Sequence, residues 1–352
     1  MTGTHAVDLV RQRAVASRPD DTRRALATLH RHHPWVFRTI PDPNALAREF
    51  ARFAVTVNFH PDRLARDGRS TAAGLLTTGT FRSQFATGIS SGSLSPDTGG
   101  ERLEWERQLF GLESADADHR PCYGALNLAG HPDGAAPRFG SCFLELSPTT
   151  RRRSTLSVGD SHQLPHDLGT FDEAMGVLAG LLELADRTGT ALRSESGDVR
   201  GIVESLGRAL PGLPSHRAGR ALDDYLEVQI HGPIHLDTDV TALVVDPSFR
   251  GTATGDELTA AAATHGVRVR WHRGSGLHAD DVDPEFRGPR ITELARWVEQ
   301  RFGGPITADT VGLAHRELVG RPPPVPQEDW AQRNQELKQL WHAVVEFGKP
   351  LR

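Results

Sequence analysis

The chain has 352 residues, a formal net charge of −5 and 38% hydrophobic residues, the balance of an ordinary globular protein with one large or two ordinary domains. The acidic balance disfavours a broadly basic nucleic-acid-binding protein, and no apolar run approaches the roughly 20 residues that cross a membrane. Because the first residues also lack the basic-then-apolar pattern of a secretion signal, we expect a cytoplasmic protein with no membrane partner.

Residues 1–53 are predicted to form a helical segment ahead of the first strand. Acidic capping residues favour a helix from about residue 20 to residue 33, and Asn44 favours a second helix that ends at Phe53. Apolar side chains recur on one face of the second helix, which therefore has a packing surface.

The stretch 54–63 is predicted to contain an apolar strand that is followed directly by polar and charged residues. β-Branched residues alternate with polar ones, as in a half-buried strand. Pro61 cannot donate to a ladder, so the strand should end there and leave His60, Asp62 and Arg63 at its mouth. An imidazole, a carboxylate and a guanidinium within four residues indicate a site, although a strand followed by a polar turn explains the same pattern.

Residues 70–93 are predicted to form a helix, a short strand and a loop through which a ligand can approach the backbone. A helix is predicted over 70–79, and residues 80–93 combine a short strand over 80–85 with a loop of small polar residues. Such a loop lets backbone approach a ligand, and a flexible connector is the alternative interpretation. An amphipathic helix is predicted over 101–110.

Two further strands are predicted over 141–146 and 155–158, and the second leads into Gly-Asp-Ser-His at 159–162. The two cysteines of the chain, Cys122 and Cys142, form neither a C-x-x-C motif nor a disulfide framework. We expect both thiols to be reduced.

A second apolar strand with polar chemistry is predicted over 224–231. Its apolar residues point one way, and the other face carries Tyr225, Glu227, Gln229 and His231. A carboxylate, an amide and an imidazole in register indicate a face that meets solvent, a partner or a substrate. An exposed edge strand is the alternative interpretation.

The remaining pattern completes an α+β fold with a mixed or antiparallel central sheet of about six strands surrounded by helices. The last strand is predicted over 267–272. Helices are predicted over 171–187, 199–210, 238–245, 256–265, 290–302, 307–319 and 328–347. We divide the chain into an N-terminal helical segment (1–53), an α+β catalytic core (54–272) and a C-terminal helical extension packed on the core (273–352).

Several motifs resemble those of a bacterial family known only as a domain of unknown function. The resemblance covers about residues 54–349 and rests on the segments beginning at Phe81 (Phe-Arg-Ser-Gln-Phe-Ala-Thr-Gly-Ile-Ser), Tyr123 (Tyr-Gly-Ala-Leu-Asn), Phe139 (Phe-Gly-Ser-Cys), Gly159 (Gly-Asp-Ser-His), Tyr225 (Tyr-Leu-Glu-Val-Gln-Ile-His-Gly) and Leu337 (Leu-Lys-Gln-Leu-Trp-His). No activity accompanies this family.

The order of elements also resembles, more distantly, ADP-ribosyltransferases of the His-Tyr-Glu type. That resemblance implies an ADP-ribosyltransferase-like fold and NAD as substrate, with an unknown acceptor. It implies that His60 bonds the NAD ribose, that Tyr123 stacks on nicotinamide, and that Glu227 stabilises the cationic sugar. It also implies that Arg82 contacts the pyrophosphate of NAD. The other residues implied to contact NAD or the acceptor are Ser83, Phe85, Asn127 and Gln229.

The chain departs from the pattern of that superfamily at two places. Pro61 follows His60, where relatives usually have glycine. In many relatives a glutamine or glutamate lies two residues before the catalytic glutamate, whereas here Gln229 lies two residues after Glu227. The superfamily likeness is one of order and roles.

Two other functional classes stay open from the sequence. A metal-dependent hydrolase could use carboxylate and imidazole ligands, which suit zinc or manganese, from His60, Asp62, Asp160 and His162. A non-enzymatic interaction protein is indicated by the Pro-rich linker 321–326 and the terminal helices. The sequence leaves the oligomeric state open.

Overall fold

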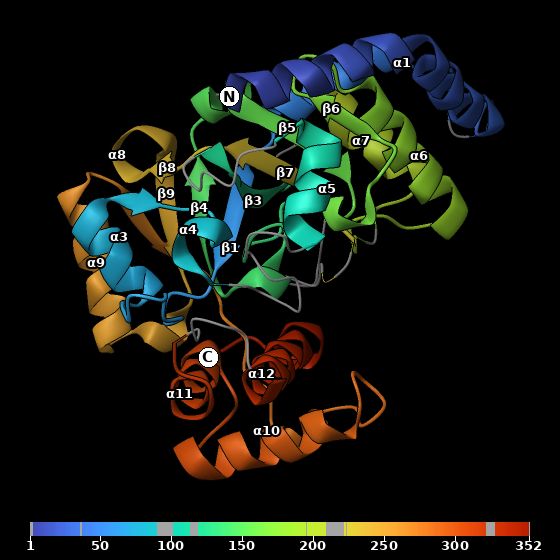
Figure 1. Ribbon diagram of the computed structural model, residues 1–352. Coiled ribbons are helices and arrows are strands. Elements are labelled where there is room, and N and C mark those ends of the chain that lie inside the picture. The colour runs from blue at the N-terminus through green and yellow to red at the C-terminus, as the bar shows by residue number, and fades with distance from the viewer. Residues whose placement is uncertain are drawn as a thin grey trace.

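Eight strands form one mixed sheet, and helices surround it (Figure 1). The computed structural model describes residues 3–35, 37–89, 101–112, 119–194, 196–208, 222, 224–321 and 328–351. The predicted α+β class with a mixed sheet is confirmed, with eight strands in the central sheet instead of about six. Most of the Pro-rich linker and the far end of the predicted 80–93 loop lie outside the described residues.

The central sheet has the strand order β10-β9-β4-β1-β3-β7-β5-β6. Its strands β9 and β10 pair parallel, and the other neighbours pair antiparallel. The strands are β1 (Val55–Phe59), β3 (Pro121–Leu126), β4 (Cys142–Leu146), β5 (Ser154–Val158), β6 (Leu168–Thr170), β7 (Leu226–His231), β9 (Val240–Val245) and β10 (Arg268–Trp271). A separate two-stranded sheet joins β2 (Thr80–Phe81) to β8 (Ile234–His235).

Helices lie around the sheet in groups. The long helix α1 runs beside α6 at the top of Figure 1, whereas α10, α11 and α12 lie together at the bottom. The helices are α1 (Gly3–Arg31), α2 (Pro43–Glu49), α3 (Thr71–Thr78), α4 (Gln84–Thr87), α5 (Glu101–Phe110), α6 (Met175–Thr188), α7 (Val199–Arg208), α8 (Leu236–Asp239), α9 (Ala253–Thr264), α10 (Pro289–Phe302), α11 (Ala308–Leu318) and α12 (Glu328–Phe347). Within the described ranges, no helix is long and apolar enough to cross a bilayer.

The prediction of a helix over 238–245 is wrong. Only the short α8 precedes this stretch, and residues 240–245 form β9 between β4 and β10. Four β-branched residues in six lose side-chain freedom in a helix but fit a pleated strand. The nearly continuous burial of β9 gives it the apolar run of an interior strand, without the alternation of a half-exposed one.

Other element boundaries also differ from the predictions. The strand predicted over 80–85 covers Thr80–Phe81 alone, because Ser83 is the N-cap residue at the start of the helical turn α4. This short strand pairs with β8 and lies outside the central sheet. The first helix begins at Gly3, well before residue 20. Strands β3 and β6 were not among the predicted strands.

Ladder register places polar side chains together on one face of the sheet. Residues directly opposite each other in an antiparallel pair share a face. Gln229 lies opposite Tyr123 on one side and Thr155 on the other, and Glu227 lies opposite Ser157. The other face of β7, with Leu226, Val228 and Ile230, belongs to the main hydrophobic core.

Strand β7 is an interior strand. It lies between β3 and β5, and all six of its residues are buried. The predicted common face of Glu227, Gln229 and His231 is therefore present, whereas the alternative of an exposed edge strand is wrong. Its polar groups must be satisfied inside the protein.

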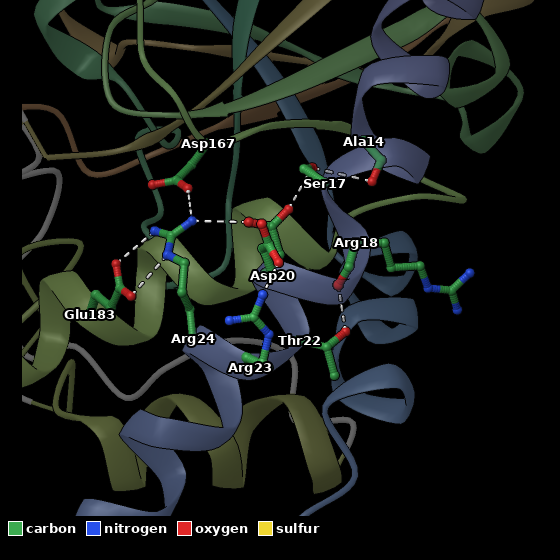
Figure 2. Close-up of polar contacts among 10 residues, drawn as sticks. Ala14, Ser17, Arg18, Asp20, Thr22, Arg23, Arg24, Asp167 and Glu183 are labelled. Atoms are coloured by element: carbon green, nitrogen blue, oxygen red, sulfur yellow. Dashed lines mark hydrogen bonds and ion pairs between the residues drawn. The ribbon is translucent and has the colours of Figure 1, made fainter.

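A charged network fastens α1 to α6 and to the segment before β6. Figure 2 shows the Arg24 guanidinium between Glu183 of α6 and Asp167, with Nη2 to Glu183 Oε2 at 2.6 Å and Nη1 to Asp167 Oδ1 at 2.7 Å. Arg24 Nη1 also donates to Asp21 on its own helix at 3.0 Å. The side chain of Arg24 is 29% exposed, so water screens these contacts only in part.

Replacing Arg24 by alanine removes a cation that three carboxylates share and leaves them facing one another. We expect the Arg24→Ala variant to lose about 1–3 kcal/mol of unfolding free energy in urea denaturation. The matched Arg23→Ala variant breaks an exposed ion pair with Asp20 on the same helix and should lose less than about 0.5 kcal/mol. Equal losses for the two variants would contradict the role given to this network.

Candidate functional site

A cavity of about 510 Å³ lies where β1 ends, with α12 forming part of its wall. Its wall contains His60, Tyr123 and Glu227, the three residues predicted as catalytic. His60 follows the last residue of β1, Tyr123 lies in β3, and Glu227 lies in β7. From α12 the wall includes Trp330, Asn334, Gln335 and Lys338.

Glu227 is a buried carboxylate, 3% exposed, with neutral hydrogen-bond partners. Its Oε1 accepts from Gln229 Nε2 at 2.8 Å and from the backbone N–H of Ser161 at 3.3 Å. Among the described residues, no cation lies within ion-pair distance of it. Burial and the nearby Asp160 raise the pKa of Glu227 to about 8, against hydrogen bonds from Ser161 and Gln229 that favour the anion.

A chain of hydrogen bonds between side chains of β5 and β7 fixes the position of Glu227. Gln229 Nε2 also donates to Ser157 Oγ at 3.0 Å, and Thr155 Oγ1 donates to Gln229 Oε1 at 2.7 Å. Thr155 Oγ1 lies 3.1 Å from His231 Nε2. Burial, with the charge of Arg153, lowers the pKa of His231 to about 3, so the imidazole at the end of this chain is neutral.

Asp160 and His162 form a second pair beside Glu227. His162 Nδ1 lies 3.0 Å from Asp160 Oδ1, and both residues line the cavity. Burial alone would raise the pKa of Asp160, but hydrogen bonds from His162 outweigh it and lower that pKa. Two neighbouring carboxyl groups thus have pKa values that are pushed apart, a pattern common at acid–base sites.

Tyr123 is held by a charged cluster formed by Arg102 and Glu106 of α5 and by Arg120, the residue before β3. Its hydroxyl donates to Glu106 Oε1 at 2.6 Å, and Arg120 Nη1 donates to Glu106 Oε2 at 2.7 Å. The Arg102 guanidinium lies 5.1 Å from the centroid of the Tyr123 ring and 4.5 Å from that of Trp105. One face of the Tyr123 ring is therefore covered by a cation.

His60 lies in a basic environment. Burial lowers its pKa well below the ordinary value, and neighbouring basic groups lower it further: Arg63, His315 and His342. Its ring meets the edge of Trp341 from α12 with centroids 5.3 Å apart. At neutral pH His60 is a neutral ring.

Asn334 of α12 ties this region to the C-terminal helices. Its Oδ1 accepts from Arg63 Nη1 at 3.0 Å and lies 3.2 Å from His315 Nε2 on α11. Trp341 Nε1 donates to the carbonyl of Pro137 at 2.7 Å. These contacts hold α12 against the mouth of β1.

The five residues predicted to contact NAD or its acceptor occupy different places. Arg82 is exposed and Ser83 is buried, and both line the cavity. Phe85, Asn127 and Gln229 are not in its wall. Phe85 lies under a buried arginine, Asn127 closes a turn, and Gln229 lies behind Glu227.

Of the four residues of the alternative metal site, Asp160 and His162 are paired and His60 lines the same cavity, whereas Asp62 lies elsewhere. Asp62 is buried against Gly312 of α11, where an added Cβ would lie 1.5 Å from its Oδ2, and it is not in the cavity wall. Burial raises the pKa of Asp62 to about 6. Over the part of the chain that the structure describes, no three His, Cys, Asp or Glu side chains form a group that could hold a metal ion.

Arg102 and Glu106 in the predicted helix 101–110 were not among the predicted site residues. They are four residues apart with opposite charges, a spacing that is typical of a solvent-exposed pair on a helix. In the structure both are buried, with Glu106 fully inaccessible. Trp105 between them was the available signal, because an aromatic residue indicates that this side of the helix packs inward.

Comparison with known proteins identifies a family whose description names no activity. The family described as "Protein of unknown function (DUF3626)" matches residues 54–347, and the resemblance to a domain of unknown function is confirmed. The Gene 2 protein of Mycobacterium phage D29 is 36% identical over 190 residues, and the Gene 2 protein of Mycobacterium phage L5 is 26% identical over 188 residues. Each match covers 52% of this chain and 65% of the phage protein, so the chain spans less than two thirds of either relative.

The raised pKa of Glu227 gives stability a definite pH dependence. The ordinary value is 4.5 and the folded value is about 8, so the folded protein binds more protons in this window and loses stability as pH rises through it. The Glu227→Gln variant lacks this loss. We expect its unfolding free energy, relative to wild type, to increase between pH 5 and pH 8 by up to about 1.4 kcal/mol per pH unit.

The control for this measurement is Glu293→Gln, which removes an exposed carboxylate on α10. Its urea denaturation curves should follow the pH dependence of wild type. If the curves of Glu227→Gln also ran parallel to wild type from pH 5 to pH 8, Glu227 would not be protonated in the folded protein.

Proposed function

Since the chain belongs to this family, DUF3626, whose description assigns no activity, we propose from the cavity itself that the protein is an NAD-consuming enzyme of the ADP-ribosyltransferase type. NAD and an acceptor carrying a proton would give nicotinamide, the ADP-ribosylated acceptor and a proton. The proposal includes an ADP-ribosyltransferase-like arrangement of the central sheet, with His60, Tyr123 and Glu227 around one cavity.

The observation that carries this proposal is the carboxylate of Glu227. It is buried in the cavity wall with amide and backbone N–H partners, and no described cation neutralises it. A buried carboxylate of this kind is suited to a cationic ligand or transition state. The nicotinamide–ribose end of NAD carries positive charge, which moves onto the sugar as the neutral ring leaves.

Binding of the cationic substrate would convert the protonated Glu227 of the empty cavity into the carboxylate that this chemistry needs. A positive charge nearby favours the carboxylate and lowers its pKa from the value in the empty cavity. Gln229 and the Ser161 N–H then hold the anion in a fixed orientation. Preorganised electrostatic stabilisation of this type is often the largest single contribution to catalysis.

Two other groups have proposed roles. His60 is neutral at the end of β1 and can donate one hydrogen bond and accept another, as ribose hydroxyls require. His162, held by Asp160 and 38% exposed, is positioned to take the proton of the acceptor. The stacking role of Tyr123 stays a prediction, since Arg102 covers one face of its ring.

The test is release of nicotinamide from NAD by the purified protein, measured with and without a metal chelator. We expect release that survives chelation and falls at least about 100-fold in Glu227→Gln, as for loss of one preorganised charge-stabilising group. The control Glu293→Gln should keep wild-type activity. His60→Ala should weaken NAD binding, measured by calorimetry.

Other outcomes of this test favour different functions. Activity that is abolished by chelation and restored by zinc or manganese would favour the metal-dependent hydrolase. Absence of both NAD binding and nicotinamide release would overturn the proposal. Binding without release would direct the search to a missing acceptor, because a transferase can need both substrates.

A further inference from the structure

Arg102 is a buried cation that makes no hydrogen bond to the described residues. It is 7% exposed, it lines the cavity, and it donates no hydrogen bond to any residue within the described ranges. Its Nε is fully enclosed and has no acceptor. A guanidinium carries five N–H donors, and leaving them unmatched in the interior is costly.

The neighbouring carboxylate does not resolve this mismatch. Glu106 Oε1 accepts from Tyr123 and Glu106 Oε2 accepts from Arg120, so both oxygens already have strong donors. Arg102 Nη1 lies 4.0 Å from Glu106, too far for a hydrogen bond. Glu106 thus lies beside two buried arginines but accepts a hydrogen bond from Arg120 and none from Arg102.

The composition of the cavity wall extends this positive character. Arginine and lysine supply seven lining residues, whereas aspartate and glutamate supply three. Trp105, in contact with Arg102, lines the same wall and its indole N–H is buried without an acceptor. Two buried donors on this wall, Arg102 Nε and the Trp105 indole N–H, therefore lack acceptors beside an excess of basic side chains, and this favours binding of an anion with several acceptor oxygens.

We propose that Arg102 is the anchor for a phosphate group of the cavity's ligand, and that the ligand class is a nucleoside diphosphate compound. The choice of a diphosphate rests on the proposed function. The guanidinium lies 4.5 Å from the Trp105 ring centroid and 5.1 Å from that of Tyr123, and its Nη groups, which are not fully enclosed, are the donors available for paired hydrogen bonds to phosphate oxygens. The cavity then recognises two groups of the ligand, a cationic group beside Glu227 and an anionic phosphate at Arg102.

The anchor role predicts an unusual effect on the empty protein. Arg102→Met keeps the apolar stem and a sulfur contact with the rings but removes a buried charge that has no hydrogen-bonded partner among the described residues. We expect the melting temperature of ligand-free Arg102→Met to equal or exceed that of wild type. Arg120→Met is the matched control, and its melting temperature should fall because Glu106 loses its hydrogen-bonded cation.

Binding is measured by calorimetry with inorganic pyrophosphate, ADP and adenosine. Wild type should bind pyrophosphate and ADP but not adenosine, and Arg102→Met should bind both at least about tenfold more weakly. Arg82→Gln, at an exposed position of the same wall, should lose less affinity than Arg102→Met. These ligands contain no nicotinamide, so the result does not depend on whether the protein cleaves NAD.

Three results would overturn the anchor role. They are pyrophosphate affinity in Arg102→Met within twofold of wild type, no pyrophosphate binding by wild type, and unfolding of both Arg102→Met and Arg102→Gln. The last result would show that Arg102 is satisfied in the empty protein and acts in the fold alone. Pyrophosphate binding that depends on Arg102 in a protein that releases no nicotinamide would keep the anchor and reject the proposed reaction.

Discussion

A row of polar side chains is buried on one face of the central sheet, and the need to satisfy them determines much of the structure around the cavity. The hydrogen bonds run from His231 through Thr155 and Gln229 to Glu227. These buried groups satisfy one another's hydrogen bonds, and they can do so because β5 lies beside β7 with Thr155 in register with Gln229. The same requirement gives Glu227 one fixed orientation.

The cavity is completed by groups that stabilise the folded protein poorly on their own. Glu227 and Arg102 are both buried ionisable groups, and each lacks a hydrogen-bonded partner of opposite charge among the described residues. Each such group costs on the order of a few kcal/mol in an empty protein, and the hydrophobic core around α6 and β7 offsets that cost. Perturbed groups of this kind are common at functional sites, where a ligand supplies the missing interactions.

Local sequence patterns were sufficient for some elements and insufficient for others. The alternation in 54–60 and 224–231 located β1 and β7, and the apolar stripe of α12 gave its bounds correctly. Strand β3 was overlooked because Pro121 and Gly124 weaken a strand pattern, and only pairing with β1 and β7 makes them tolerable. The cavity residues His60, Tyr123 and Glu227 came from the order of elements, whereas the burial of Arg102 depends on tertiary packing that no local spacing reveals.

The position of α12 in the chain affects when the cavity forms during synthesis. Asn334 and Trp341 hold the mouth of β1 through Arg63 and the loop before β4, yet they follow β1 by most of the length of the protein. A ribosome releases β1, β3 and β7 well before it releases α12, so the central ladder can pair while one wall is still missing. A chain interrupted by a premature stop before α12 would carry His60 and Glu227 on a paired sheet but would lack the part of the cavity wall that α12 supplies. Translation to the end of α12 is thus a built-in condition for whatever chemistry this cavity performs.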